Sequence, residues 1–198
     1  MVVVTKTVPE ERVRDALAAG VRDLGENRAQ DLVAKAEAIG PAPAGTDFPA
    51  PRWHFIGQLQ RNKVRMLAPH VDLWHSIDRP ELADPLARNA PGARVLVEVN
   101  LSEEPQKGGC APDGAPALVE QLRGAGLVVE GLMTVPAAAG DPRPAFAALR
   151  DLAGRLELPQ LSMGMTADFE TAIAEGATIV RIGSAVFGPR PRPDGLRR

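Results

Sequence analysis

The amino-acid sequence predicts an α/β fold, a single (β/α)8 TIM barrel. Two observations predict it. Eight short apolar runs alternate with segments of helical periodicity, and polar or reactive side chains follow nearly every apolar run. Strands that alternate with helices form parallel sheets, and a count of eight favours closure into a barrel, for which 198 residues is near the lower size limit. An open doubly wound sheet is the competing architecture, but no glycine triad follows the first strand and GxxxxGK[ST] is absent.

The expected strands are short runs rich in β-branched and other apolar residues. They lie, in order, at residues 2–4, 21–24, 53–56, 71–77, 94–99, 127–133, 158–162 and 178–182. The expected helices have apolar residues three or four positions apart, and several end at a glycine. They lie at residues 9–19, 28–39, 61–67, from about 80 onward, 115–123, 144–156 and 168–174, with a short turn at 185–187. Asp78 is expected to cap the helix that starts near Pro80.

Two proline-rich segments stand apart from this alternation. Residues 41–51 contain four prolines and predict a surface connection. Residues 189–198 contain four arginines and predict a disordered, solvated tail that follows a barrel domain at 1–188.

Composition excludes several classes of protein. Charged residues make up 24% and the net charge is −2, so no basic field favours nucleic acid or an anionic membrane. Cys110 is the only cysteine, which excludes an internal disulfide and fits a reducing compartment. No signal peptide or membrane-spanning run is present. We therefore expect a cytoplasmic protein, and a monomer because no additional dimerisation segment is evident.

The ends of the expected strands carry most of the potentially reactive side chains. In a (β/α)8 barrel these ends share one face, where the chemistry takes place. Polar residues also favour strand ends because water solvates them there, so the clustering alone is modest support. The residues at this face are Lys6, Asn27, His54, His75, Asn100, Met133, Ser162 and Arg181.

The loops after strands seven and eight predict a phosphate site. Small residues that lead into helix N-termini present unpaired N–H groups to an anion, and this position is the common phosphate site of the fold. Glycine and serine are also ordinary loop residues, so a purely structural role stays open at this point. The residues are Ser162, Gly164, Met165, Thr166, Gly183 and Ser184.

Lys6 ends the first strand and is a candidate for covalent chemistry. A solvated strand-end lysine is the alternative, since lysine is seldom buried. Together with a phosphate site after strands seven and eight, Lys6 suggests a phosphorylated aldehyde held as a Schiff base. Pyridoxal 5'-phosphate fits, with Arg181 facing the pyridine nitrogen. Lys107 is a weaker second candidate for aldehyde capture. No metal is expected, because His54, His70 and His75 lack a metal-ligand spacing.

Seven motifs in register resemble those of the pyridoxal phosphate homeostasis protein family. They are distributed along nearly the whole chain. They are VTKTVP (4–9), GEN (25–27), WHFIGQLQRNK (53–63), HSID (75–78), GLMT (131–134), SMGM (162–165) and VRIGSAVFG (180–188). Thr166 stands where serine is common in the family, and the lysine strand begins at Val2, where a helical segment usually precedes it.

The resemblance implies a fold-type III barrel like the N-terminal domain of alanine racemase, without that enzyme's additional β domain. It implies that Lys6 carries the cofactor as a Schiff base and that Arg181 lies beside the ring nitrogen. The phosphate would be held by Ser162, Thr166, Gly183 and Ser184, and the pocket would be lined by Asn27, His54 and Met133. The implied function is to buffer pyridoxal phosphate and deliver it, through transient contact with apo-enzymes, without catalytic turnover.

An amino-acid racemase of the same fold type is the alternative function. Racemisation needs acid–base groups on both faces of the cofactor, and alanine racemase supplies one of them as a tyrosine from its additional domain. The present sequence contains no tyrosine. The sequence therefore favours a binding protein over an enzyme.

Overall fold

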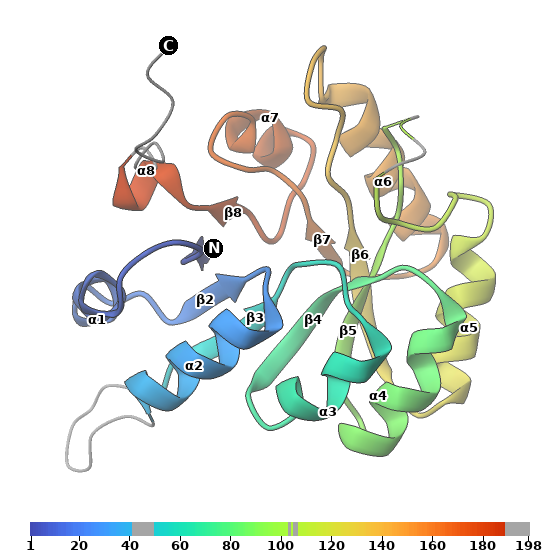
Figure 1. The fold of residues 1–198 in the computed structure, drawn as a ribbon. Coiled ribbons are helices and arrows are strands. Elements are labelled where there is room, and N and C mark those ends of the chain that lie inside the picture. The colour runs from blue at the N-terminus through green and yellow to red at the C-terminus, as the bar shows by residue number, and fades with distance from the viewer. Residues whose placement is uncertain (41–49, 103, 105–106, 189–198) are drawn as a thin grey trace, which may run out of the picture.

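The computed structural model describes residues 1–40, 50–102, 104 and 107–188, and its strands form one parallel barrel (Figure 1). The eight strands are ordered β7-β6-β5-β4-β3-β2-β1-β8, so neighbours in sequence are neighbours in space. They are β1 (Val2–Val4), β2 (Asp23–Glu26), β3 (Arg52–Phe55), β4 (Val71–Ile77), β5 (Arg94–Glu98), β6 (Val128–Met133), β7 (Gln160–Ser162) and β8 (Arg181–Ile182).

The first and last strands lie side by side, as barrel closure requires. In β1, Val3 is the partner of Leu24 on one side and of Ile182 on the other. The remaining seam, between β7 and the segment before β8, is joined by a parallel bridge from Ser162 to Ile179. The predicted barrel is therefore confirmed, and the open doubly wound sheet is excluded.

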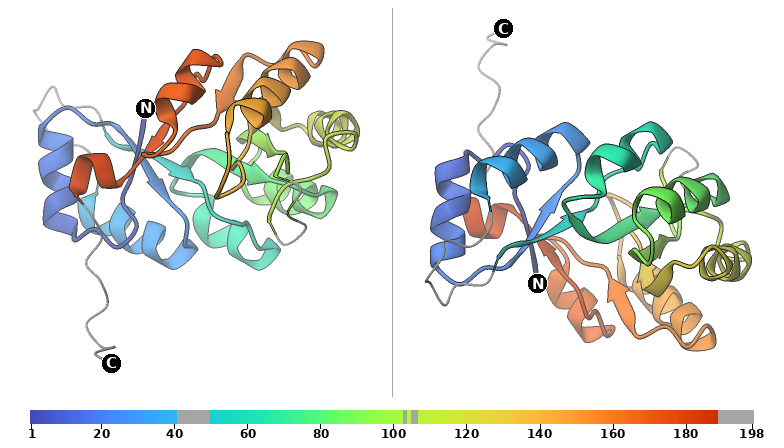
Figure 2. Two further views of the ribbon diagram at one scale, coloured as in Figure 1. Left: turned by 90° about the horizontal axis from the view of Figure 1, so that it is seen from above. Right: turned by 90° about the horizontal axis from the view of Figure 1, so that it is seen from below.

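The helices lie outside the strands, as the two further views in Figure 2 show. The α-helices are α1 (Glu10–Ala18), α2 (Ala29–Ile39), α3 (Val64–Leu67), α4 (Ala83–Asn89), α5 (Ala115–Gly124), α6 (Arg143–Arg155), α7 (Phe169–Ala174) and α8 (Ser184–Phe187), and the short 3₁₀ helices are η1 (Arg61–Lys63) and η2 (Pro80–Leu82). None of the described helices is long and apolar enough to cross a membrane.

Several local predictions differ from the structure. The second strand begins two residues later than expected, because the Val21 N–H still bonds to Ala16 O at the end of α1. The eighth strand is shortened to two residues, and Ile179 contributes only an isolated bridge. The predicted Asp78 cap is wrong, because its carboxylate accepts a hydrogen bond from Arg79 instead.

The two sides of the sheet are packed differently. Outside, large apolar side chains fill the space between strands and helices, among them Trp74 and Phe146. Inside the barrel there is a separate small apolar cluster of Leu73, Leu96 and Met133. The proline-rich connection predicted at 41–51 lies largely outside the described residues, and the predicted tail at 189–198 lies entirely outside them.

Candidate functional site

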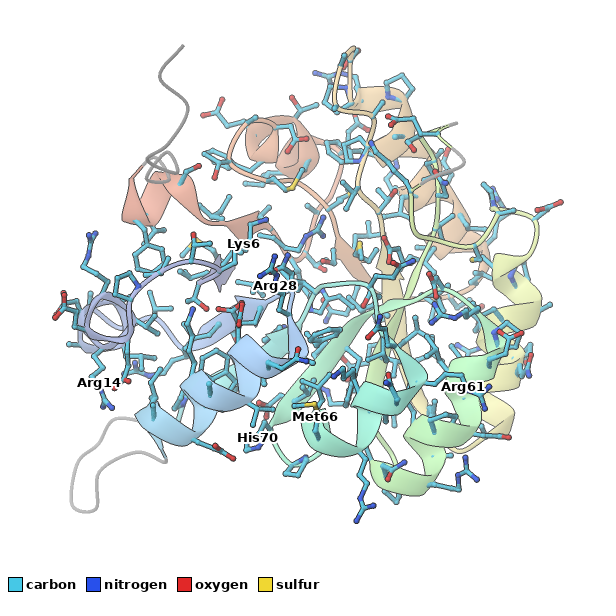
Figure 3. The ribbon with its side chains drawn as sticks, in the orientation of Figure 1. Lys6, Arg14, Arg28, Arg61, Met66 and His70 are labelled. Carbon is cyan, nitrogen blue, oxygen red and sulfur yellow. The ribbon has the colours of Figure 1, made fainter. Side chains whose placement is uncertain are left out.

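Lys6 lies in a tight turn directly after β1 and is half-buried (Figure 3). The turn is closed by a 2.9 Å hydrogen bond from the Val8 N–H to Thr5 O. Its third residue, Thr7, has a φ of 64°, in the left-handed region that glycine normally occupies. Such a conformation costs a non-glycine residue about 1–2 kcal/mol. The backbone is thus held in an unfavourable conformation immediately beside the candidate lysine, a pattern that occurs at functional sites.

A buried ion pair holds the residue before Lys6. Lys35, on α2, donates to Thr5 O at 2.5 Å and to Glu26 Oε1 at 2.6 Å. The Thr5 hydroxyl donates to the same Glu26 oxygen at 2.8 Å, and Glu26 is fully buried. The Thr5 side chain therefore points toward α2, and Lys6 follows it in the turn.

Sequence reasoning missed this anchor, although a signal was present. Glu26 ends the second strand, and Lys35 lies in the following helix, nine residues later. Burying both charges requires that they pair.

A continuous chain of polar side chains crosses the barrel interior. Asp23 Oδ1 lies 3.2 Å from His54 Nε2, and His54 Nδ1 lies 2.9 Å from His75 Nε2. His75 Nδ1 in turn lies 2.9 Å from Ser162 Oγ. Arg181 Nη1 then donates to Ser162 Oγ at 2.7 Å. The chain runs from Asp23 at the start of β2 to Ser162 at the C-terminal end of β7 and Arg181 in β8.

Arg181 is a buried cation with neutral hydrogen-bond partners. Its guanidinium donates to Ser162 Oγ and, at 2.9 Å, to Thr134 O. No carboxylate of the described residues lies within ion-pair distance of it. Burial lowers the pKa of Arg181 to about 10, with Glu98 acting in the opposite direction, so the group stays charged at neutral pH. An uncompensated positive charge inside a barrel favours an anionic or electron-rich ligand nearby.

In the loop after β7, two of the predicted phosphate-site residues already have a role in the protein's own packing or hydrogen bonding. Gly164 has a φ of 90°, and a Cβ there would lie 2.6 Å from the Ala172 Cβ, so packing against α7 by itself requires glycine. The Met165 N–H donates to Asp168 Oδ1 at 2.6 Å and is already paired. Thr166 is half-buried, and its hydroxyl is the side-chain donor that this loop offers.

Gly183 behaves differently from Gly164. Its φ of −121° is negative, and an added Cβ would make only ordinary contacts of 3.4–3.5 Å with Val4. The protein's own packing therefore does not require glycine there, whereas close approach of a bound group would. Ser184 follows, exposed, and opens α8. The residues present thus fit a phosphate at this loop.

The other predicted pocket residues lie at different depths. Asn27 directly follows β2 and is exposed, and Met133 ends β6 and is 1% exposed. His54 lies deeper, within the polar chain, and borders a depression of about 210 Å³ at the N-terminal ends of the strands. Lys107 pairs with Glu104 at 3.0 Å and donates to Pro136 O. The structure therefore brings Lys6, Met133, Ser162 and Arg181 to one pole and places His54 below it.

Glu98 is a second group that sequence reasoning missed. It ends β5, points to the same interior as Leu96, and is 9% exposed. Burial raises the pKa of Glu98 to about 7; Asp78 acts in the same direction and Arg181 opposes it. Its position was readable from β5, because Val95 and Val97 alternate with Leu96 and Glu98.

Comparison with known proteins identifies the family. The sequence matches the family described as "Alanine racemase, N-terminal domain" over residues 6–191. A pyridoxal phosphate homeostasis protein from Pseudomonas aeruginosa is 44% identical over 96% of this chain and 84% of its own length. The chain belongs to the pyridoxal phosphate homeostasis protein family. Another member, from Aquifex aeolicus, is 44% identical over 94% of this chain and 85% of its own length.

Solved structures agree with this family assignment. PipY from Synechococcus elongatus, in a structure with PLP bound, has a TM-score of 0.84 at 34% identity and covers 95% of this chain and 92% of its own. Lysine decarboxylase from Selenomonas ruminantium has a TM-score of 0.71 at 16% identity, covering 93% of this chain and 56% of its own. That second likeness shows the shared barrel alone.

Proposed function

We propose that this protein binds pyridoxal 5'-phosphate and acts as a carrier that buffers the cofactor and delivers it to apo-enzymes. The Lys6 amine would attack the aldehyde carbon, and loss of one water molecule would leave a C=N bond. Hydrolysis would reverse both steps and release the cofactor, so no net reaction takes place. Bound cofactor supplies an electron-poor ring and a dianionic phosphate, and the residues of this chain hold both.

The observation that carries the proposal is the buried Arg181, which has no direct ion pair among the described residues and lies at the same pole as Lys6 and the Gly183–Ser184 loop. A phosphate held by Ser162, Thr166, Gly183 and Ser184 would lie at the ends of β7 and β8, with Arg181 beside the ring nitrogen. Arginine donates but does not accept hydrogen bonds, so it would leave that nitrogen unprotonated. Asn27 and Met133 would complete the pocket around the ring. The structure of PipY with PLP bound supports the same ligand.

Two features favour binding without turnover. The chain contains no tyrosine to serve as the second acid–base group of a racemase. In addition, an unprotonated ring nitrogen weakens the ring as a sink for electrons from a substrate carbanion. An amino-acid racemase of the same fold type is the alternative.

Transfer to an apo-enzyme tests the carrier function. We expect the loaded protein to reactivate an apo-aminotransferase, and a Lys6→Ala variant to hold no covalent cofactor for delivery. Lys63→Ala is the matched control, since Lys63 lies in η1 on the outer layer. Racemisation of alanine by the wild type, abolished in Lys6→Ala, would assign the protein to the enzymes instead.

A further inference from the structure

We propose that the interior pair of His54 and His75 couples phosphate binding at Ser162 to the uptake of one proton. The inference rests on the proposed function, because it needs Ser162 to face the phosphate. It assigns a positioning role to two histidines and explains why a cofactor site would lie at the end of a hydrogen-bonded chain. The steps concern only the hydrogens on this chain's own atoms.

Without bound anion, and with both imidazoles neutral, one arrangement of hydrogens satisfies every contact. Asp23 is a carboxylate, so His54 must carry its single hydrogen on Nε2, 3.2 Å from Asp23 Oδ1. His54 Nδ1 is then an acceptor, and His75 must donate to it from Nε2 across 2.9 Å. His75 Nδ1 is left without a hydrogen.

The next link in the chain is the serine. Its hydroxyl must donate to His75 Nδ1 across 2.9 Å, while its oxygen accepts from Arg181 Nη1 at 2.7 Å. Every donor thus points from Arg181 toward Asp23. The Ser162 hydrogen is committed to His75 and is not available to a phosphate oxygen.

One added proton reverses the two middle links, from His54 to His75 and from His75 to Ser162. A doubly protonated His54 donates to Asp23 from Nε2 and to His75 Nε2 from Nδ1. His75 then carries its hydrogen on Nδ1 and donates to Ser162 Oγ. The Ser162 hydrogen is released and can point to a phosphate oxygen. The two states differ by one proton taken from solvent: the His75 Nε2–H bond breaks as its hydrogen passes to His54 Nδ1, and the added proton forms the new N–H bond at His75 Nδ1.

Charged groups of both signs surround His54. Asp23 faces it from β2, and His75 and Asp72 lie on β4; the Asp72 carboxylate accepts from the Trp53 N–H at 2.7 Å. Arg52 on its own strand pairs with Asp23 at 2.7 Å, and Arg94 pairs with Glu130 at 2.5 Å across the same depression. Arg181 lies at the far end of the chain, beyond His75.

Two pKa shifts agree with this assignment. The hydrogen bond from His54 is the largest cause that lowers the pKa of Asp23 to about 2, so Asp23 is ionised throughout the relevant range. Burial, followed by the charges of His54 and Arg181, holds the pKa of His75 well below its usual range. His75 thus relays the change as a neutral ring, and His54 takes the charge.

Linkage fixes the sign of the effect. Because the bound state holds one more proton, binding strengthens as pH falls and weakens as pH rises. The limiting slope is about tenfold in affinity per pH unit. A plot of the logarithm of affinity against pH should therefore be steeper for the wild type than for a His54→Gln variant, whose amide does not titrate. The difference in slope should approach this limit.

Calorimetric titration of the full chain with pyridoxal phosphate, in two buffers of different ionisation enthalpy, measures the proton count. We expect the wild type to take up about one more proton per bound cofactor than His54→Gln. His70→Gln is the matched control, because His70 is the third histidine and lies outside the chain of contacts; it should behave as the wild type.

Nitrogen-15 NMR of the wild-type imidazoles, with inorganic phosphate as the probe, tests the same claim without a substitution. We expect the His75 hydrogen to move from Nε2 to Nδ1 and the His70 signals to stay unchanged. If cofactor binds and the proton count and tautomer do not change, the coupling is wrong and the carrier proposal stands. If no cofactor binds at all, the proposed function fails, and the coupling fails with it.

Discussion

The outer and inner sides of the same sheet serve different purposes. On β3, Trp53 and Phe55 point outward into the apolar layer under the helices, whereas His54 between them points into the polar chain. On β4, Trp74 points outward and His75 points inward. Because successive side chains face opposite sides of the sheet, a residue that stabilises the fold is followed directly by one that faces the ligand site. Stability and cofactor binding should therefore respond independently to substitutions on the two sides.

The largest stability effect should come from the outer side. Phe146, on α6, is fully buried, and Phe146→Ala should lower the free energy of unfolding by about 3–5 kcal/mol. Urea denaturation measures the loss. The variant that remains folded should bind pyridoxal phosphate with unchanged stoichiometry, and a loss of binding in folded protein would contradict the separation of the two sides.

The anchor between α2 and Thr5 should have the next largest effect, and it should act on both properties. Lys35→Ala leaves the fully buried Glu26 carboxylate without its cation, which should cost about 2–3 kcal/mol because Lys35 itself is partly exposed. It also releases the Thr5 carbonyl beside Lys6, so cofactor affinity should fall.

Urea denaturation and a cofactor titration measure the two effects of Lys35→Ala. Lys63→Ala, on the outer layer, should change either property little. Equal behaviour of the two variants would show that the Lys35 ion pair does not support the Lys6 turn.

Glu98 offers a smaller effect whose sign depends on pH. Its folded pKa of about 7 lies above the ordinary value of 4.5, so the folded state holds the proton more tightly. Stability should therefore fall as pH rises from 4.5 to 7 and stay reduced above 7. Glu98→Gln, which never ionises, should match the wild type at pH 4 and be more stable by about 1–3 kcal/mol at pH 8. Denaturation at the two pH values is the measurement, and an equal change at both would exclude the titration.

Much of the fold was predictable because it rests on local periodicity. The eight strands, their parallel order and the helix positions follow from apolar runs and glycine stops. The boundaries that failed depend on single hydrogen bonds, such as that from Val21 to Ala16, which no pattern encodes. Asp78 failed as a cap for a similar reason, since Arg79 competes for its carboxylate.

The site was predictable where it follows strand ends and not where it depends on pairing across the barrel. Lys6, Ser162 and Arg181 were found because each lies at or near the end of an apolar run in the sequence. The contact between His54 and His75 can be predicted only from the register of β3 against β4. In that register, His54 is opposite Leu73 after a bulge. The interior position of Glu98 was readable from alternation, but its neighbour Arg181 comes from a strand far along the chain.

Chemical mapping of the lysine tests the central claim most directly. The chain has four lysines, Lys6, Lys35, Lys63 and Lys107, so borohydride reduction of the cofactor-loaded protein followed by peptide mass spectrometry can distinguish them. We predict a reduced pyridoxyl group on Lys6 at one per chain, absent from Lys6→Ala and retained in Lys107→Ala. A stoichiometric label on another lysine, or an undiminished label in Lys6→Ala, would contradict the account.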